Sequence, residues 1–214
     1  MNPTFSVVIP IYNRSEFLAE TLASVHAQTI SPVEILVVDD GSGDKEAKII
    51  SPIVDEAGAK LIQQANAGAG VARNRGTQEA VGSYLVFLDS DDLMVPTAIS
   101  TYTEIINNNH ASLLAACVIE FSQDSSSSRE IVSDIKMNRY ADYLASSRNS
   151  EVTLGAGMMV VRKDLFLESS GFTKETINAE DHDMAMRLAT APVFVQIVSP
   201  TTLMYRRHTN SLTA

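Results

Sequence analysis

The chain is poor in cysteine, which limits both its chemistry and its architecture. Its 214 residues include a single cysteine, Cys117, within the apolar run 113–119. One cysteine excludes a disulfide framework, and apolar neighbours favour a buried structural thiol over a nucleophile. We therefore expect a protein of a reducing compartment and predict a cytoplasmic location.

Long hydrophobic runs are also missing. No apolar run reaches the roughly 18 residues needed to span a bilayer, and no basic segment precedes the first strand pattern. The sequence thus predicts no transmembrane segment, although a peripheral association with a membrane stays open. With 45% hydrophobic residues the chain can still bury a sizeable core, and we expect one globular unit.

Basic residues are the minority among the charges. The chain has 16 Lys and Arg against 26 Asp and Glu, a net charge of −10, which argues against nonspecific nucleic-acid binding. An anionic substrate therefore needs a metal or a local basic cluster. Neither a Gly-x-Gly-x-x-Gly fingerprint nor a Gly-x-x-x-x-Gly-Lys-Ser/Thr loop occurs, so a dinucleotide-binding fold and a phosphate-loop ATPase are disfavoured.

What the chain does contain is a buried strand that ends in acids. Residues 84–88 are all apolar or aromatic and lead directly into Asp89, Asp91 and Asp92. Carboxylates this close repel one another, so they need open solvent or a cation, and hard oxygen ligands suit Mg²⁺ or Mn²⁺. The alternative is a solvated acidic turn in which Asp92 caps the helix that Pro96 opens.

Two earlier strands lead to the same predicted edge. The run 5–10 is followed by Tyr12, and the run 33–38 is followed by Asp40. Strands that alternate with helices through about residue 119 predict an α/β protein with a mostly parallel sheet, whose ligands bind at the carboxyl ends of the strands. Tyr12 there either stacks on a base or covers the core.

Local signals add further expectations around these strands. Asn13, three residues before Glu16, predicts a helix start with a capping box, and Pro52 should shorten or kink the helix that begins at Asp44. Small residues at 66–70 open a helix mouth suited to an anion, with Arg73 nearby. The serine-rich tract 122–128 predicts an exposed loop.

The second half is less regular but contains another acidic node. A strand is predicted at 158–161, with strands again at 193–198 and 203–205. Residues 180–183 include Glu180, Asp181 and Asp183 and lead into an amphipathic helix whose inward face carries Met184 and Leu188.

Six segments together resemble the signature blocks of family 2 glycosyltransferases. They occur in the family's order across nearly the whole chain, at residues 6–13, 37–42, 70–74, 87–92, 180–181 and 207–208. The resemblance implies the GT-A fold, a Rossmann-like, mostly parallel central sheet flanked by helices in one compact domain. It also implies a nucleotide-diphosphate-sugar donor, a divalent metal and inversion at the anomeric carbon.

The resemblance divides the domain into a nucleotide-sugar-binding half, 1–121, and an acceptor and catalytic-base half, 122–214. It implies that Asp181 is the general base, and that Asp91 and His208 hold the metal, Mn²⁺ or Mg²⁺. A surface histidine is the other interpretation of His208, and Glu180 is an acceptor-binding or helix-start residue. The implied donor-binding residues are Pro10, Tyr12, Asp40, Arg73, Asp89 and Ser90.

The sequence departs from the family pattern near the base. Many relatives have an aromatic residue just before the Glu-Asp pair, where this chain has Asn178 and Ala179, and the chain has no tryptophan. The resemblance therefore implies an acceptor pocket that is small or completed by something else.

The chemistry favours one reaction class. A nucleoside diphosphate is a good leaving group, so one carboxylate base suffices, whereas a hydrolase needs two catalytic carboxylates. The leading hypothesis is an inverting transferase that moves a sugar from a nucleotide-diphosphate donor, with a UDP-sugar favoured, to a hydroxyl of a saccharide or lipid-linked acceptor in cell-surface polysaccharide or glycan synthesis. The alternative is a non-catalytic nucleotide-sugar-binding module. A nucleotidyltransferase is disfavoured because that chemistry usually needs a Gly-rich loop with a basic residue at the first strand, and residues 10–14 supply only Arg14.

Overall fold

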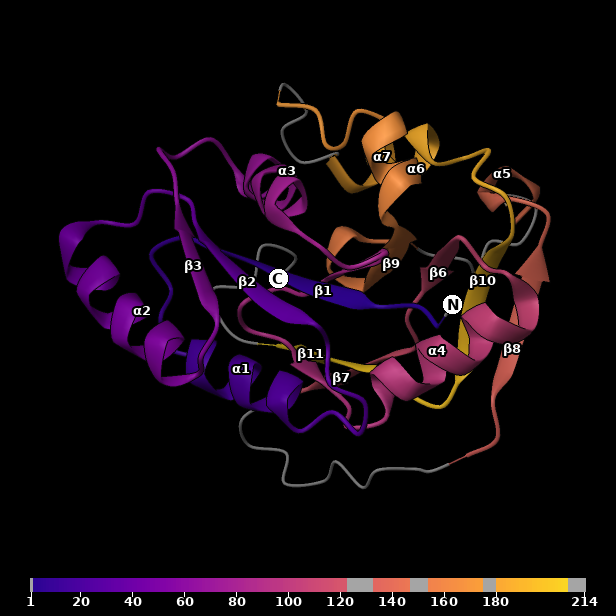
Figure 1. Ribbon diagram of the computed structural model, residues 1–214, viewed down its shortest axis with the longest axis horizontal. Coiled ribbons are helices and arrows are strands. Elements are labelled where there is room, and N and C mark those ends of the chain that lie inside the picture. Colours follow the sequence, from indigo (N-terminus) through magenta and orange to yellow (C-terminus); the bar gives the residue numbers. More distant parts are fainter. Residues whose placement is uncertain (1, 123–132, 147–153, 175–179, 208–214) are drawn as a thin grey trace.

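An eight-stranded sheet lies at the centre of the computed structural model, which describes residues 2–122, 133–146, 154–174 and 180–207 (Figure 1). The strand order is β3-β2-β1-β4-β9-β6-β10-β8. In chain order the elements are β1 (Phe5–Ile11), α1 (Leu18–His26), β2 (Glu34–Asp39), α2 (Asp44–Glu56), β3 (Lys60–Gln63), α3 (Ala69–Glu79), β4 (Tyr84–Phe87), β5 (Leu93–Met94), α4 (Ala98–Asn109), β6 (Leu113–Ala115), β7 (Val118–Phe121), β8 (Lys136–Tyr140), α5 (Tyr143–Ser146), the 3₁₀ turn η1 (Ala156–Met158), β9 (Met159–Arg162), α6 (Lys163–Glu168), α7 (Glu180–Arg187), β10 (Phe194–Ser199) and β11 (Leu203–Arg206).

The sheet is parallel on one side and mixed on the other. β3, β2, β1 and β4 are mutually parallel, as the alternation of strands and helices predicts. β9 then lies antiparallel between β4 and β6, and β8 closes the far edge antiparallel to β10. The predicted α/β class is confirmed, with a mixed rather than uniformly parallel sheet.

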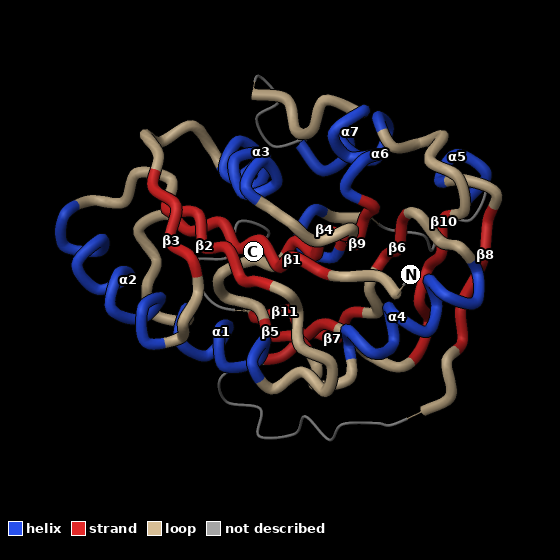
Figure 2. Tube along the Cα trace, viewed as in Figure 1, coloured by secondary structure: helices blue, strands red, loops and turns tan. Residues whose placement is uncertain are grey.

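Helices cover both faces of the sheet (Figure 2). Successive residues of a strand point to opposite faces, so Val7 and Ile9 of β1 pack in the core with α1, α2 and α4, while Val8 packs with α3, α6 and α7. Because both faces are covered, β1 is buried along its whole length.

Two local predictions need correction. Helix α1 begins at Leu18 with Phe17 as its N-cap and no capping side chain, so the capping box at Asn13 is wrong. Helix α2 continues through Pro52 to Glu56, so the proline does not shorten it, because the buried residues Ile50 and Val54 hold both sides of the proline against the core. A kink at Pro52 stays a prediction.

A second, three-stranded sheet lies beside the carboxyl end of β4. Its order is β5-β11-β7, with β11 antiparallel to β5 and parallel to β7. Cys117 precedes β7, and its thiol contacts the Val198 carbonyl oxygen at 3.1 Å; burial raises the pKa of this thiol, in keeping with a structural role. Residues 123–128 of the serine tract lie outside the described part of the chain.

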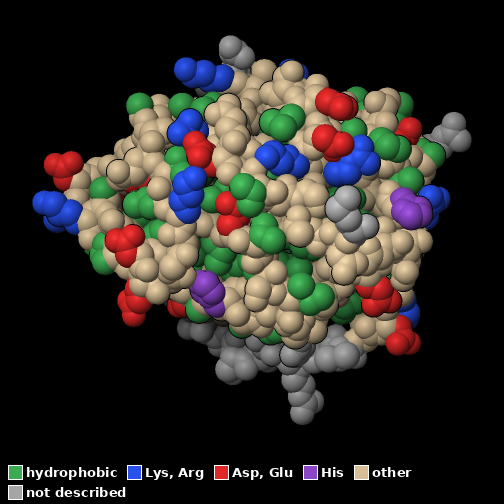
Figure 3. All heavy atoms as spheres, in the orientation of Figure 1, with side chains coloured by type: hydrophobic (Ala, Val, Ile, Leu, Met, Phe, Trp, Pro, Cys, Tyr) green, Lys and Arg blue, Asp and Glu red, His purple; other side chains and the backbone are tan. Residues whose placement is uncertain are grey.

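No helix in the described part of the chain combines the length and the apolar character needed to cross a membrane. On the face seen in Figure 3, acidic and basic side chains are interspersed, so the negative charge of the chain is not concentrated there.

Candidate active site

The ends of three parallel strands meet at one edge of the sheet. The register of β1 with β2 places Ile11 beside Asp39, and β4 pairs with β1 on its other side. The Asp40 N–H donates to the Ile11 carbonyl (2.9 Å), which continues the ladder past the strand end. The segments that carry Tyr12, Asp40 and Asp89 therefore leave the sheet at the same edge.

Asp40 accepts hydrogen bonds from two backbone N–H groups and one side-chain amide. Its Oδ1 accepts from Gln64 Nε2 (2.7 Å) and the Ala67 N–H (2.9 Å), and its Oδ2 accepts from the Gly68 N–H (2.8 Å). The residue is 2% exposed. Asp40 is therefore buried and bonded within the chain, and its contact with a nucleotide base stays a prediction.

The loop after β1 is fastened to the loop after β2. Asn13 adopts a left-handed backbone (φ 49°); its N–H donates to Ser42 Oγ and its Oδ1 accepts from the Gly43 N–H, each at 2.8 Å. Pro10 is buried in β1, whereas Tyr12 is 51% exposed. The Tyr12 ring therefore does not cover the core and is accessible for stacking.

Asp92 faces inward and has a structural role. It is 1% exposed, and its Oδ1 accepts from the backbone N–H of Arg206 (2.9 Å). Burial, followed by the nearby charge of Asp89, raises the pKa of Asp92 to about 8. The N-cap of α4 is Thr97, without a capping side chain, so the alternative in which Asp92 caps this helix is wrong.

Asp89 and Asp91 each contact an arginine. Asp89 Oδ1 accepts from Arg73 Nη2 at 2.6 Å, and Asp91 Oδ2 accepts from Arg14 Nη1 at 2.8 Å. Their side chains are 35% and 15% exposed. Both carboxylates are therefore accessible from the strand-end edge, and Arg14 is a site residue whose place the sequence indicated only by its position after β1.

Arg73 of α3 joins the two acidic nodes. Its Nη2 binds Asp89, its Nη1 binds Glu180 Oε1 at 3.1 Å, and its guanidinium lies 5.4 Å from the Phe172 ring centre. Burial opposes the charge, but Asp89, Glu180 and Asp181 outweigh it and raise the pKa of Arg73. Its Nε has no hydrogen-bond partner in the described chain. Arg73, a predicted donor-binding residue, thus bridges the carboxylates of Asp89 and Glu180.

The carboxylates of Asp89 and Asp181 both lie close to one short segment, residues 155–157. A Cβ on Gly157 would lie 2.5 Å from Asp89 Oδ2, and a Cβ on Gly155 would lie 3.4 Å from Asp181 Oδ2. Gly157 lies within the turn η1 and Gly155 directly precedes it, so this short segment runs along both carboxylates. Gly157 is a site position that the sequence analysis missed, and the only signal was its place in a Gly-Ala-Gly triplet.

The acidic loop, residues 89–92, suits a divalent cation whose other ligands come from substrate phosphates and water. Described residues form no cluster of three or more His, Cys, Asp or Glu side chains suited to a metal. Mg²⁺ sites commonly use one or two carboxylates plus substrate phosphates and water, and Asp89 and Asp91 are the carboxylates that would form such a pair. Ser90 is buried, its carbonyl accepting from Thr21 Oγ1 (2.9 Å). The predicted ligand His208 lies outside the described residues, as do Asn178 and Ala179.

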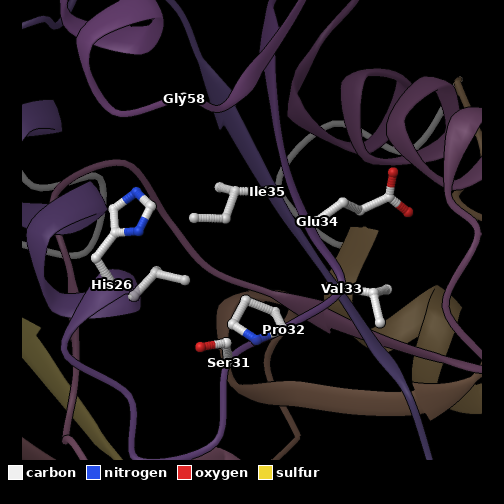
Figure 4. A pocket seen from close by; sticks show the side chains of 8 residues that line it. His26, Ser31, Pro32, Val33, Glu34, Ile35 and Gly58 are labelled. Carbon is white, nitrogen blue, oxygen red and sulfur yellow. The ribbon is translucent and has the colours of Figure 1, made fainter.

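A cavity of about 190 Å³ lies at the opposite end of β2 (Figure 4). Its lining includes His26, Pro32 and Gly58. Glu34 also borders it, but its carboxylate is directed away from His26 and accepts from Ser6 Oγ and the Val81 N–H. The cavity therefore brings no carboxylate to His26, and it lies apart from the acidic edge.

The structure is that of an α/β protein in which carboxylates after β4 and at the start of α7 lie near one short segment at the edge of the sheet. The family model for glycosyl transferase family 2 matches residues 6–168, and the chain belongs to this family.

Relatives and solved structures agree with this assignment. The uncharacterized glycosyltransferase EpsJ of Bacillus subtilis is 28% identical over the whole chain, which covers 64% of EpsJ. Chondroitin synthase of Escherichia coli is 27% identical over 91% of the chain, which covers 28% of that protein. The chain thus spans less than two thirds of either relative.

Among solved structures, S. aureus TarS in complex with UDP-GlcNAc matches with a TM-score of 0.78 at 24% identity. The match covers 97% of this chain and 60% of that one. The likeness establishes the GT-A fold, as the six sequence blocks implied.

Proposed function

We propose that the protein is an inverting, metal-dependent glycosyltransferase that moves a sugar from a nucleoside-diphosphate donor, a UDP-sugar, to a hydroxyl of a saccharide or lipid-linked acceptor. Polysaccharide or glycan synthesis in the cytoplasm is the proposed setting. Family membership supports the reaction class, and the UDP-GlcNAc bound to TarS supports the donor class.

One observation carries the proposal. Asp89, at the end of a donor-half strand, and Asp181, at the start of α7, both approach the turn at Gly155 and Gly157. Arg73 connects the same two regions through Asp89 and Glu180. A sugar held at this turn would have Asp89 of the donor side on one side and the carboxylate base Asp181 on the other.

The proposed reaction needs one proton acceptor. Asp181 takes the proton of the acceptor hydroxyl while the hydroxyl oxygen forms a bond to the anomeric carbon. The bond from that carbon to the diphosphate oxygen breaks, and the nucleoside diphosphate leaves with the electron pair. Attack from the side opposite the leaving group inverts the anomeric carbon.

The donor half binds and orients the nucleotide. Asp40 would accept from the base N–H, and Tyr12 would stack on the base. Asp91, with Asp89 beside it and His208 beyond the described residues, would hold the divalent cation. When bound, this cation stabilises the negative charge that develops on the diphosphate.

The decisive variant is Asp181→Asn, which preserves size and most hydrogen bonding but removes the proton acceptor. We expect the transfer rate to fall by on the order of 10²–10⁴ while UDP affinity, measured by calorimetry, stays at the parental value. Asp183→Asn is the matched control, because Asp183 lies on the same helix but pairs with Arg187 at 2.8 Å. It should leave transfer nearly unchanged.

Other outcomes redirect the proposal. If Asp181→Asn transfers sugar at the parental rate, the catalytic base is another residue. Loss of UDP binding would assign Asp181 to the nucleotide or to the fold. A parent that binds UDP-sugars but transfers to no acceptor in a saccharide and lipid-linked panel would favour the non-catalytic binding module. Calorimetry with UDP, GDP, CDP and dTDP, each with and without Mn²⁺, tests the base and metal requirements together.

A further inference from the structure

Arg206, at the end of β11, is a buried cation that the proposed reaction does not use. Its side chain is 2% exposed. The guanidinium carbon lies 4.4 Å from the Phe17 ring centre and 4.6 Å from the Phe121 ring centre. The charge is thus held against two aromatic rings, one before α1 and one at the end of β7.

The hydrogen bonds of Arg206 converge on the acidic loop. Its Nε donates to the backbone carbonyl of Asp91 (2.7 Å), and its own N–H donates to Asp92 Oδ1 (2.9 Å). Its Nη2 also donates to Glu20 Oε2 of α1 (2.7 Å). One residue therefore binds two consecutive residues of this loop, through its side chain and its backbone.

Arg206 is itself held on a rigid support. In the three-stranded sheet Arg206 pairs with Phe121 of β7, and β11 also pairs with β5, which directly follows the acidic loop. The Asp91 main chain is thus fixed from the β11 side, while the Asp91 carboxylate meets Arg14 from the β1 side. The position of that carboxylate depends on both arginines.

We propose that Arg206 is the positioning residue of the acidic loop: by holding the Asp91 carbonyl, it sets the Asp91 carboxylate where a divalent cation and a diphosphate can share it. This inference rests on the proposed function. Arg206 touches neither substrate nor metal in this account, and it acts through the backbone of Asp91. The planar guanidinium, which donates to Asp91 and Glu20 at once, suits this task better than a lysine ammonium.

The test measures how much Mn²⁺ increases UDP affinity. Calorimetry with and without Mn²⁺ gives this enhancement for the parent, Arg206→Met and Arg206→Lys, well below each melting temperature. We expect the Mn²⁺ enhancement of UDP affinity to be about tenfold smaller in Arg206→Met than in the parent, the scale of one hydrogen bond to a charged group. Metal-free UDP affinity should change by less than about twofold. Arg206→Lys, which keeps the charge, should fall between the two.

Arg162→Met is the control for the loss of an arginine. Arg162 is 39% exposed, pairs with Asp164 on the surface and lies outside the six family blocks. Its enhancement should equal that of the parent.

Each result bears on one of the two claims. A parental enhancement in folded Arg206→Met, or in Arg206→Lys if the Met variant does not fold, overturns the positioning role. Equal losses of UDP affinity with and without Mn²⁺ also overturn it, because a purely structural defect lowers both. A parent without any Mn²⁺ enhancement contradicts the proposed metal and leaves the structural contacts of Arg206 unaffected.

Discussion

The two halves of the sheet hold their acidic residues in different ways. On the parallel side, Asp40 and Asp89 follow strands whose register is set by backbone hydrogen bonds. On the mixed side, Glu180 and Asp181 occupy the first turn of α7, a helix of eight residues. Among the described residues, the ion pair between Glu180 and Arg73 joins this turn to the parallel side.

This difference suggests a division of labour. Strand ends supported by a parallel sheet form a rigid binding edge, because many backbone bonds would have to break together for one residue to move. A short helix held by side-chain contacts can adjust more easily to an acceptor. The variants below probe this contrast between the halves, in order of decreasing expected effect.

Asp91→Asn should weaken UDP binding in Mn²⁺ by on the order of 100-fold, since the rigid edge would lose its principal metal carboxylate. Calorimetry in Mn²⁺ measures the change. Asp92→Asn is the control: an amide oxygen still accepts from the Arg206 N–H, so UDP affinity should stay near the parental value. If Asp91→Asn binds UDP as the parent does, the metal assignment is wrong.

Arg73→Met should cut the link between the halves. It leaves Asp89 and Glu180 facing each other without a cation, and we expect the free energy of unfolding to fall by about 2–3 kcal/mol. Urea unfolding measures this. Arg75→Met, two residues along α3, removes an arginine that is 45% exposed and pairs with Glu79 on the surface. Equal stability losses in both variants would show that the buried link does not join the halves.

Gly157→Ala should move Asp89, whose carboxylate oxygen lies 2.5 Å from the position of the added Cβ. Transfer should fall by about tenfold, the scale of a small misplacement at a reacting centre. Gly155→Ala brings the new Cβ only to an ordinary contact distance from Asp181, 3.4 Å. Steady-state rates compare the two. If Gly155→Ala loses more transfer activity than Gly157→Ala, the contact at Asp181 matters more than the contact at Asp89.

Glu180→Gln should have the smallest effect. The amide oxygen can still accept from Arg73, and only the charge is lost, so transfer should fall by about threefold. Acceptor kinetics distinguish its two roles. A change in kcat alone fits a positioning role through Arg73, whereas a raised KM for the acceptor at constant kcat would support the predicted acceptor contact.

Sequence patterns located the strands and strand ends well because these depend on local signals. The apolar run before Asp89 and the run before Asp39 became β4 and β2, and the helix after Asp181 buries Met184 and Leu188 as its periodicity predicts. Each conclusion needed only hydrophobic period and chain order.

The same patterns could not distinguish neighbouring residues of like type. Asp91 is accessible and Asp92 is buried, although both follow the same strand. Arg207 belongs to the recognised block, yet Arg206 is the residue that is buried against Phe17 and Phe121. Asn13 has the sequence context of a helix cap but binds Gly43 instead.

The sequence by itself thus determined the α/β class, the order of the acidic blocks and the family, because hydrophobic periodicity and motif order are written along the chain. Only the tertiary structure decided that Arg73 bridges Asp89 and Glu180, that Gly157 lies against Asp89 and that Arg206 holds the acidic loop. These contacts join residues from 16 to 115 positions apart. Their partners are selected by burial and strand register, which no local pattern records.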